Sequence, residues 1–180
     1  MKKKNSIKNI INIAGFYTCW WLSIYGASQE SYFLGPISLL IYMIIHFIFL
    51  TENKVEYRYI LICSILAFLF DTFLLNLNLI EYRGFLSENY QIAPLWVACL
   101  WISFSLSIFH SFKILQKKYK QSMFLGVLSG PFIYYSLSKI GIITLLYSSV
   151  SILILISISW MFIIPLYVFL ADKLIDCNAE

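Results

Sequence analysis

One aspartate and two histidines stand out as the residues that could do chemistry in the apolar segments of this 180-residue chain. Asp71 lies near the middle of a long apolar stretch, and Ser64, Asp71 and Asn78 are spaced seven residues apart. That spacing places the three side chains on one face of a helix. An ionisable side chain is costly in hydrocarbon and usually faces a partner inside a helix bundle. Asp71 is therefore predicted to be either a buried acid or a hydrogen-bonded clasp between helices.

The histidines lie closer to the ends of their apolar segments. His110 follows Trp96 and Ser103 at seven-residue spacing and precedes Ser111, whereas His46 lies one helical turn before the end of an earlier segment. We expect His46, His110 and Ser111 to meet at one end of the bundle, with Asp71 on the order of 10 Å deeper. Asp71 and His110 are the candidate catalytic residues, for proton transfer or for acid–base chemistry at a lipid headgroup. Ordinary packing is the alternative for each of them.

A metal site has only weak support from the sequence. It would have to use His46, His110 and a carboxylate, and no spacing typical of metal ligands connects them. We therefore assign no metal, and the cofactor remains unknown. The four cysteines form no CxxC pair, and the chain contains no HExxH, no GxSxG and no phosphate-binding glycine loop. The absence of these motifs leaves open whether the protein is an enzyme.

Small and aromatic residues predict a cavity and a close helix contact. Ser122, Gly126 and Gly130 recur every four residues, which lets two helices approach closely, and Pro131 frees a backbone carbonyl. We expect Trp96, Trp101 and Tyr134, with His46 and Ser111, to line a cavity among the helices that carry them. The alternative for the tryptophans is core filling or anchoring at a membrane interface.

Composition indicates which kind of fold holds these residues. Hydrophobic residues make up 61% of the chain and charged residues 12%, against about 25% charged residues in soluble proteins. This excludes a soluble enzyme, a disordered chain and a disulfide scaffold. We predict an all-α fold, a polytopic membrane helical bundle that forms a single domain over residues 1–180. Its six expected transmembrane helices are residues 7–26, 31–50, 59–80, 92–115, 123–138 and 147–171.

Basic residues predict the orientation of this bundle. Of the 13 lysines and arginines, only Arg83 and Lys139 lie outside the two termini and the two alternate loops that would share their side of the membrane. Positive charge favours the cytoplasmic side. We therefore expect a bacterial inner-membrane protein with both termini in the cytoplasm, membrane lipid as a partner and no nucleic-acid partner. The lysines of residues 113–120 are a candidate contact for anionic headgroups.

Several segments, in order, resemble an uncharacterised family of small six-span bacterial inner-membrane proteins that is defined only as a domain of unknown function. They are Trp20-Trp21, Gly26-Ala27, the His46 segment, Asp71-Thr72, Pro94 to Trp101, His110-Ser111, Gly126 to Tyr134, Lys139, Gly141, Trp160 and Pro165. The chain departs from the family pattern at Ile133 and Leu137. The resemblance implies a six-span membrane protein without an established activity. It also implies genes for fatty-acid modification as neighbours.

Three functional hypotheses follow. The first is a membrane protein that acts on membrane lipids or assists their modification. The second is a small-molecule-binding or transport subunit, because six spans with short loops also resemble the substrate-binding subunits of energy-coupling-factor vitamin transporters. The third is a structural or chaperone role with a protein partner in the membrane.

Overall fold

The computed structural model describes residues 2–51, 54–85 and 91–176. Six α-helices make up most of the described residues, so the predicted all-α class is confirmed. The helices are α1 (Lys2–Ser28), α2 (Leu34–Ile45), α3 (Val55–Asn76), α4 (Leu95–Ser107), α5 (Tyr119–Lys139) and α6 (Ser149–Asp176). A π-helical turn, η1 (His46–Leu50), continues α2, and a 3₁₀ turn, η2 (Lys113–Leu115), lies between α4 and α5.

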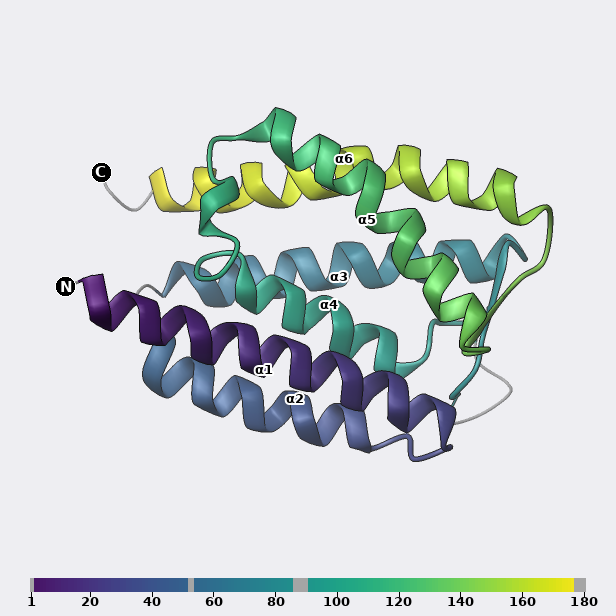
Figure 1. Cartoon of the computed structure of the whole chain (residues 1–180), viewed down its shortest axis with the longest axis horizontal. Coiled ribbons are helices and arrows are strands. Elements are labelled where there is room, and N and C mark those ends of the chain that lie inside the picture. The colour runs from purple at the N-terminus through teal and green to yellow at the C-terminus, as the bar shows by residue number, and fades with distance from the viewer. Residues whose placement is uncertain (1, 52–53, 86–90, 177–180) are drawn as a thin grey trace.

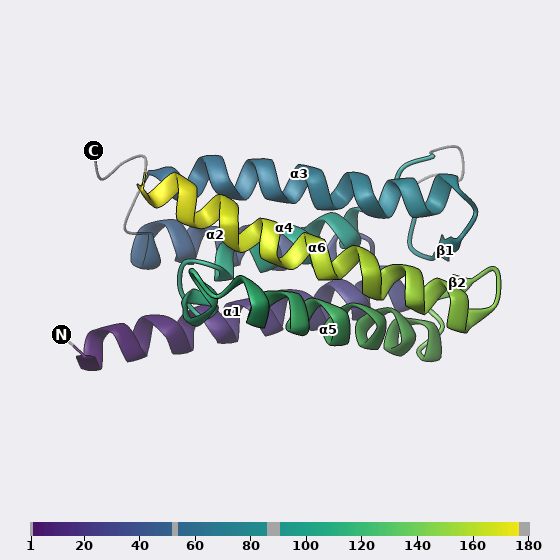
Figure 2. The same cartoon turned by 90° about the horizontal axis from the view of Figure 1, so that it is seen from above.

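The helices run back and forth along one long axis, so α1 begins and α6 ends at the same end of the molecule (Figure 1). They pack as three pairs, α1 with α2, α3 with α4, and α5 with α6. α4 is the central helix, because it also packs against α1 and α2. In the view from above, α6 crosses between α3 and α5 (Figure 2), and it contacts both.

Only part of the six-span prediction receives support. Among the described residues, α3 and α6 are the two helices long and apolar enough to cross a membrane. α4 has 13 residues and ends at Ser107, whereas the expected span continued to residue 115. Because α4 is enclosed by other helices, it needs no length matched to a bilayer.

A short antiparallel ladder closes the end opposite the termini. The strands β1 (Ile80–Tyr82) and β2 (Ile143–Leu145) pair Glu81 with Thr144. The all-α prediction contained no strands here. This ladder ties the connection after α3 to the connection between α5 and α6, and it therefore fixes the position of the Tyr82 side chain.

α5 and α6 approach closely at two glycines. A Cβ atom on Gly126 would lie 2.1 Å from the carbonyl oxygen of Trp160, and one on Gly130 would lie 2.5 Å from the Trp160 ring. Both contacts are shorter than any real Cβ contact, so only glycine fits. The helix-packing role expected for Gly126 and Gly130 thus has a defined partner, the backbone and ring of Trp160.

Pro131 interrupts the hydrogen bonds of α5 at the same place. Proline has no N–H to donate to the carbonyl four residues earlier, which belongs to Val127. The hydroxyl of Ser157 on α6 donates to that Val127 oxygen at 2.9 Å. The neighbouring helix therefore satisfies the carbonyl that Pro131 leaves free.

Large apolar side chains cover the outer faces of five of the helices. Trp21 on α1, Leu61 on α3, Phe132 on α5 and Phe162 on α6 are each at least 60% exposed, as is Ile48 beside α2. Monomeric soluble proteins rarely expose contiguous apolar surface on this scale. The surface therefore suggests association with a membrane.

The connection from α4 to α5 is anchored to α6. The carboxylate of Asp172 accepts hydrogen bonds from the Lys117 backbone N–H at 2.9 Å and from the Tyr119 hydroxyl at 3.0 Å. The second bond raises the pKa of Tyr119 above its usual value, because the hydroxyl donates to a carboxylate. This anchor holds the end of the connection, whose beginning carries His110.

Candidate functional site

Two histidines and one glutamate converge at the end of the bundle where the termini lie. Oε2 of Glu56 is 3.1 Å from Nε2 of His46 and 3.3 Å from Nε2 of His110. The imidazole rings are 5.0 Å apart between centroids and nearly perpendicular, at 83°. All three residues are buried, with 0%, 3% and 7% exposure for His46, Glu56 and His110. We refer to these three residues as the His–Glu–His cluster.

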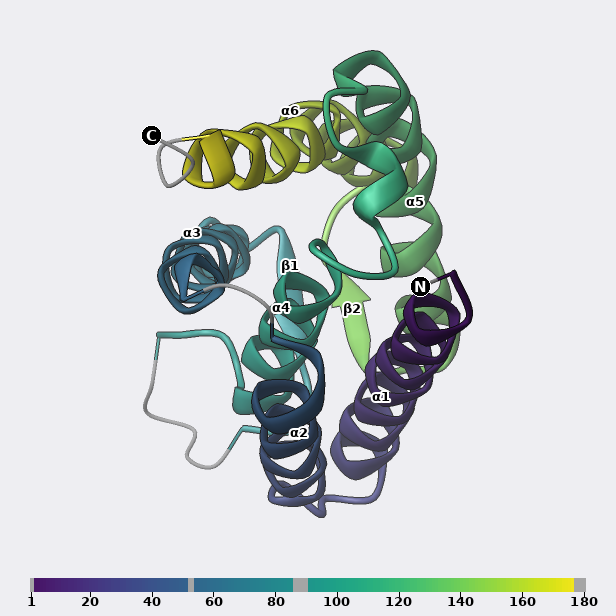
Figure 3. The same ribbon diagram turned by 90° about the vertical axis from the view of Figure 1, so that its left-hand side faces the viewer.

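Each member of the cluster comes from a point where a helix begins, ends or changes its winding. His46 opens the π-helical turn η1, which the Thr51 N–H closes by donating to the His46 carbonyl at 2.9 Å. Single π-helical turns often occur at functional sites. Glu56 lies in the first turn of α3, and His110 lies in the turns that follow α4. Figure 3 looks onto this end of the bundle, where α2 ends, α3 begins and α4 ends.

A neighbouring network links α1 to the cluster. The Asn12 amide donates to the Tyr42 hydroxyl at 2.8 Å and to the Leu106 carbonyl at 3.2 Å, while the Ser111 hydroxyl donates to the Asn12 side-chain oxygen. Tyr42 precedes His46 by one turn, and Ser111 follows His110. The expected meeting of His46, His110 and Ser111 at one end is therefore observed, with Asn12 as an additional member.

Asp71 lies in a separate, closed hydrogen-bonded clasp. Its Oδ1 accepts hydrogen bonds from the Tyr134 hydroxyl at 2.5 Å and the Tyr82 hydroxyl at 2.6 Å, and its Oδ2 accepts one from the Trp101 indole N–H. The donors come from α5, β1 and α4, so one carboxylate joins four elements. Aromatic donors thus occupy both oxygens of the carboxylate.

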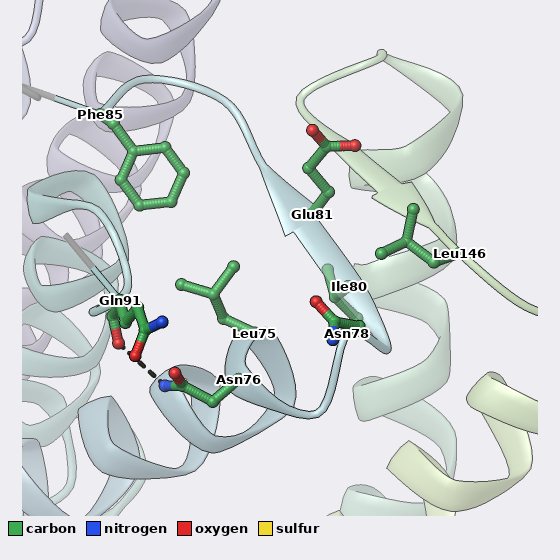
Figure 4. Close-up of a pocket in the computed structure, with 8 residues that line it drawn as sticks. All are labelled: Leu75, Asn76, Asn78, Ile80, Glu81, Phe85, Gln91 and Leu146. Atoms are coloured by element: carbon green, nitrogen blue, oxygen red, sulfur yellow. Dashed lines mark hydrogen bonds between the residues drawn. The ribbon is translucent and has the colours of Figure 1, made fainter. Parts of the chain in front are cut away.

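Two pockets lie elsewhere among the described residues. One, of about 480 Å³, is at the ladder end and is lined by Leu75, Asn76, Asn78, Ile80, Glu81, Phe85, Gln91 and Leu146. Figure 4 shows Asn76 closing one side of it by donating to the Gln91 carbonyl. The other, of about 280 Å³, lies between α1 and the end of α4 and is lined by Ile13, Phe16, Tyr17, Ser107, Ser111 and Phe112.

The expected cavity residues are distributed differently from the prediction. Ser111 lines the smaller pocket. Trp96 donates its indole N–H to the Arg83 carbonyl at 2.7 Å, and Trp101 and Tyr134 bind Asp71. None of these three aromatic residues lines either of the two pockets described above.

Residues 9–166 match a family described as "Protein of unknown function (DUF2878)". The chain belongs to this family. Its predicted resemblance to an uncharacterised family is thereby confirmed. No curated protein and no solved structure matches the chain.

The DUF2878 match includes both the His–Glu–His cluster and the Asp71 clasp. It also includes three residues that the sequence prediction missed, Glu56, Asn12 and Tyr82. Glu56 and Tyr82 lie in stretches that read as loops, so nothing in their spacing connected them to a helix face. Asn12 could have been selected from the sequence, because it is an isolated amide side chain in an apolar segment.

Proposed function

We propose that this protein is an integral membrane protein that acts on the headgroups of membrane lipids, or assists their modification, at the His–Glu–His cluster. The observation that carries the proposal is a buried cluster of ionisable side chains in a bundle whose outer faces are apolar. Ionisable groups are expensive in such surroundings and usually serve a function. Both oxygens of Asp71 already accept hydrogen bonds from three donors. The reacting groups are therefore His46, Glu56 and His110 rather than Asp71.

The position of the cluster favours headgroup chemistry over chemistry in the acyl chains. It lies at the end of the bundle that carries Lys54, Lys113 and Lys117, where positive charge favours the cytoplasmic face and anionic lipids. Two imidazole nitrogens and a carboxylate oxygen can accept a proton from water or from a headgroup hydroxyl. We therefore infer that both termini and the cluster face the cytoplasmic leaflet, with the six helices in the bilayer.

The smaller pocket offers a route from the lipid to this end. Ile13, Phe16 and Tyr17 of α1 give it an apolar wall, and Ser107 and Ser111 also line it. Ser111 is the chain neighbour of His110. A lipid whose upper acyl chain occupies this pocket would place its headgroup near the level of the cluster.

The test is lipid profiling by mass spectrometry in a strain that lacks the gene. The strain is complemented with wild type, Glu56→Gln, His110→Ala, Asp71→Asn or an empty vector. We expect a lipid species that depends on wild type and disappears in the Glu56 and His110 variants while its precursor accumulates. Asp71→Asn should retain the species wherever the variant protein reaches the membrane at wild-type level.

Two outcomes would overturn this proposal. If the profiles coincide for all five strains under several growth conditions, action on lipids is rejected. If only Asp71→Asn loses the species while the cluster variants keep it, the chemistry belongs to Asp71 and the assignment to the cluster is rejected.

The larger pocket favours one alternative, a small-molecule-binding subunit. Its lining includes the polar residues Asn76, Asn78, Glu81 and Gln91, which suit a polar ligand rather than an acyl chain. Under this alternative the purified protein retains a small polar molecule that is lost in Glu81→Ala. Mass spectrometry of the denatured protein in the two forms measures this directly.

A further inference from the structure

We infer that the His–Glu–His cluster is a binding site for a divalent transition metal, with Zn²⁺ the best match. This rests on the proposed function only in using the same three side chains. It extends that proposal by naming an inorganic cofactor that neither the sequence motifs nor the family description implies. With the ion bound, the three ligand atoms would hold the metal, and a water on the ion would take over the proton transfer.

The ligand atoms are spaced for a small ion. One carboxylate oxygen and two imidazole nitrogens lie within 4.8 Å of one another, and the two nitrogen-to-oxygen distances are 3.1 and 3.3 Å. Bonds of about 2.0–2.2 Å in a tetrahedral site place neighbouring ligands roughly 3.4 Å apart. An ion can thus enter among the three atoms with small side-chain rotations.

The types of ligand select the class of metal. Ca²⁺ and Mg²⁺ prefer oxygen ligands, and Cu⁺ prefers sulfur, whereas imidazole nitrogen suits zinc and its neighbours. Two histidines and one glutamate form a three-ligand set, which in zinc enzymes leaves the fourth position for water or substrate. The set is therefore of the catalytic rather than the closed structural type.

Charge in a poorly hydrated site gives independent support. Glu56 is only 3% exposed, and burying a carboxylate charge is costly unless opposite charge lies close to it. A Zn²⁺ ion with one carboxylate and one bound hydroxide has no net charge, since the histidines bind as neutral imidazoles. Such a neutral unit suits aromatic surroundings, and the rings of Tyr42 and Phe47 both lie edge-on against the His46 ring.

Metal binding is measured on the full-length protein, purified in detergent, stripped with a chelator and reloaded with Zn²⁺ alone. We expect one zinc per chain by elemental analysis. Glu56→Gln and His110→Ala should weaken affinity by at least the roughly 10- to 100-fold that loss of a supporting residue costs in known sites. Asp71→Asn is the matched control, because it changes a buried carboxylate outside the cluster and should bind zinc like wild type.

Cobalt and thermal unfolding separate the remaining explanations. Co²⁺ should give the visible absorption of a tetrahedral nitrogen–oxygen site without thiolate bands, and a variant with its four cysteines replaced by serine should give the same spectrum. Zinc should raise the Tm of wild type but not that of Glu56→Gln. The metal site is rejected if wild type binds no zinc, or if the cluster variants, with wild-type helical content, bind it equally well.

Lipid turnover plays no part in these measurements. Zinc binding without any lipid phenotype would keep the metal site and reject the proposed function. A lipid phenotype in a protein that binds no zinc would do the reverse.

Discussion

At the scale of single residues, the Asp71 clasp joins three donors to one buried carboxylate. Both carboxylate oxygens accept hydrogen bonds, and the three donors are aromatic side chains that are themselves buried. Aromatic donors bring a large apolar body together with one polar atom. The clasp therefore satisfies a costly polar group without admitting water, which suits a structural role.

Removing one donor should measurably destabilise the protein. Tyr134→Phe deletes the hydroxyl that donates to Oδ1 of Asp71 and leaves the ring in place. A typical intramolecular hydrogen bond contributes about 0.5–1.5 kcal/mol, so we expect a lower Tm in detergent. Tyr135→Phe is the control: its neighbouring side chain is 46% exposed, and its Tm should stay near that of wild type. Equal Tm values for the two variants would contradict the clasp.

Some of the site residues could be predicted from the sequence, and others could not. The two histidines could be placed at one end, because their distance from the ends of apolar segments fixes their depth. Glu56 could not be chosen, since it lies in a charged loop beside Glu52 and no periodicity marks one of them as buried. Tyr82 depends on the β1–β2 ladder, whose two strands are about sixty residues apart along the chain and too short to give a pattern.

At the scale of elements, α5 packs closely on α6 because α5 has two glycines and a proline at the contact. Gly126 and Gly130 have no side chains where Trp160 packs. Pro131 has no N–H to donate to the Val127 carbonyl oxygen. The spacing of the small residues predicted a close contact. The partner helix and the compensating Ser157 hydroxyl follow only from the three-dimensional arrangement.

A double-mutant cycle tests the compensation by Ser157. Ser157→Ala leaves the Val127 carbonyl without its donor in a partly buried contact, so we expect a loss of about 1 kcal/mol. In a Pro131→Ala background, residue 131 can donate to Val127 along the helix, and Ser157→Ala should cost much less. Thermal unfolding of the four proteins gives the coupling. Additive effects would show that Ser157 does not act through this carbonyl.

Adding one methyl group at Gly126 should be enough to separate the pair locally. A Cβ atom there meets the Trp160 backbone, which cannot rotate away as a side chain could. Overpacking of this kind costs about 1–3 kcal/mol, so Gly126→Ala should lower the Tm. Ser136→Ala is the matched control on α5, because its hydroxyl is exposed and bonds only to the Phe132 carbonyl of the same helix. A Tm for Gly126→Ala equal to that of Ser136→Ala would argue against the close contact.

At the scale of the whole molecule, composition predicted the helical fold well. The lengths of the individual helices were predicted least well. Hydrophobicity predicted an all-helical bundle, and the even number of helices brings both termini to one end. Equal lengths could not be assumed, because helices in a bundle need not all face lipid. α4 is short since its neighbours, rather than the bilayer, surround it.

Fusions to reporter proteins test the proposed orientation. Alkaline phosphatase is active only outside the cytoplasm, so it should be active when fused after Tyr147, which follows the ladder, and inactive at the C-terminus. Green fluorescent protein at the C-terminus should fluoresce. The reverse pattern would show that the bundle has the opposite orientation in the membrane. A fusion protein found entirely in the soluble fraction would reject the six-span arrangement.

The Asp71 clasp also has a consequence for biosynthesis. Asp71 and Trp101 emerge from the ribosome well before Tyr134, and Tyr82 reaches its final position only after β2 has been made. Until the chain has passed residue 145, the nascent protein carries an aspartate in an apolar segment with an incomplete set of donors. A polypeptide that stops after α4 should therefore be poorly retained in the membrane and readily degraded. Supplying α5 to α6 as a separate polypeptide should rescue it, which would make completion of the clasp a checkpoint in assembly.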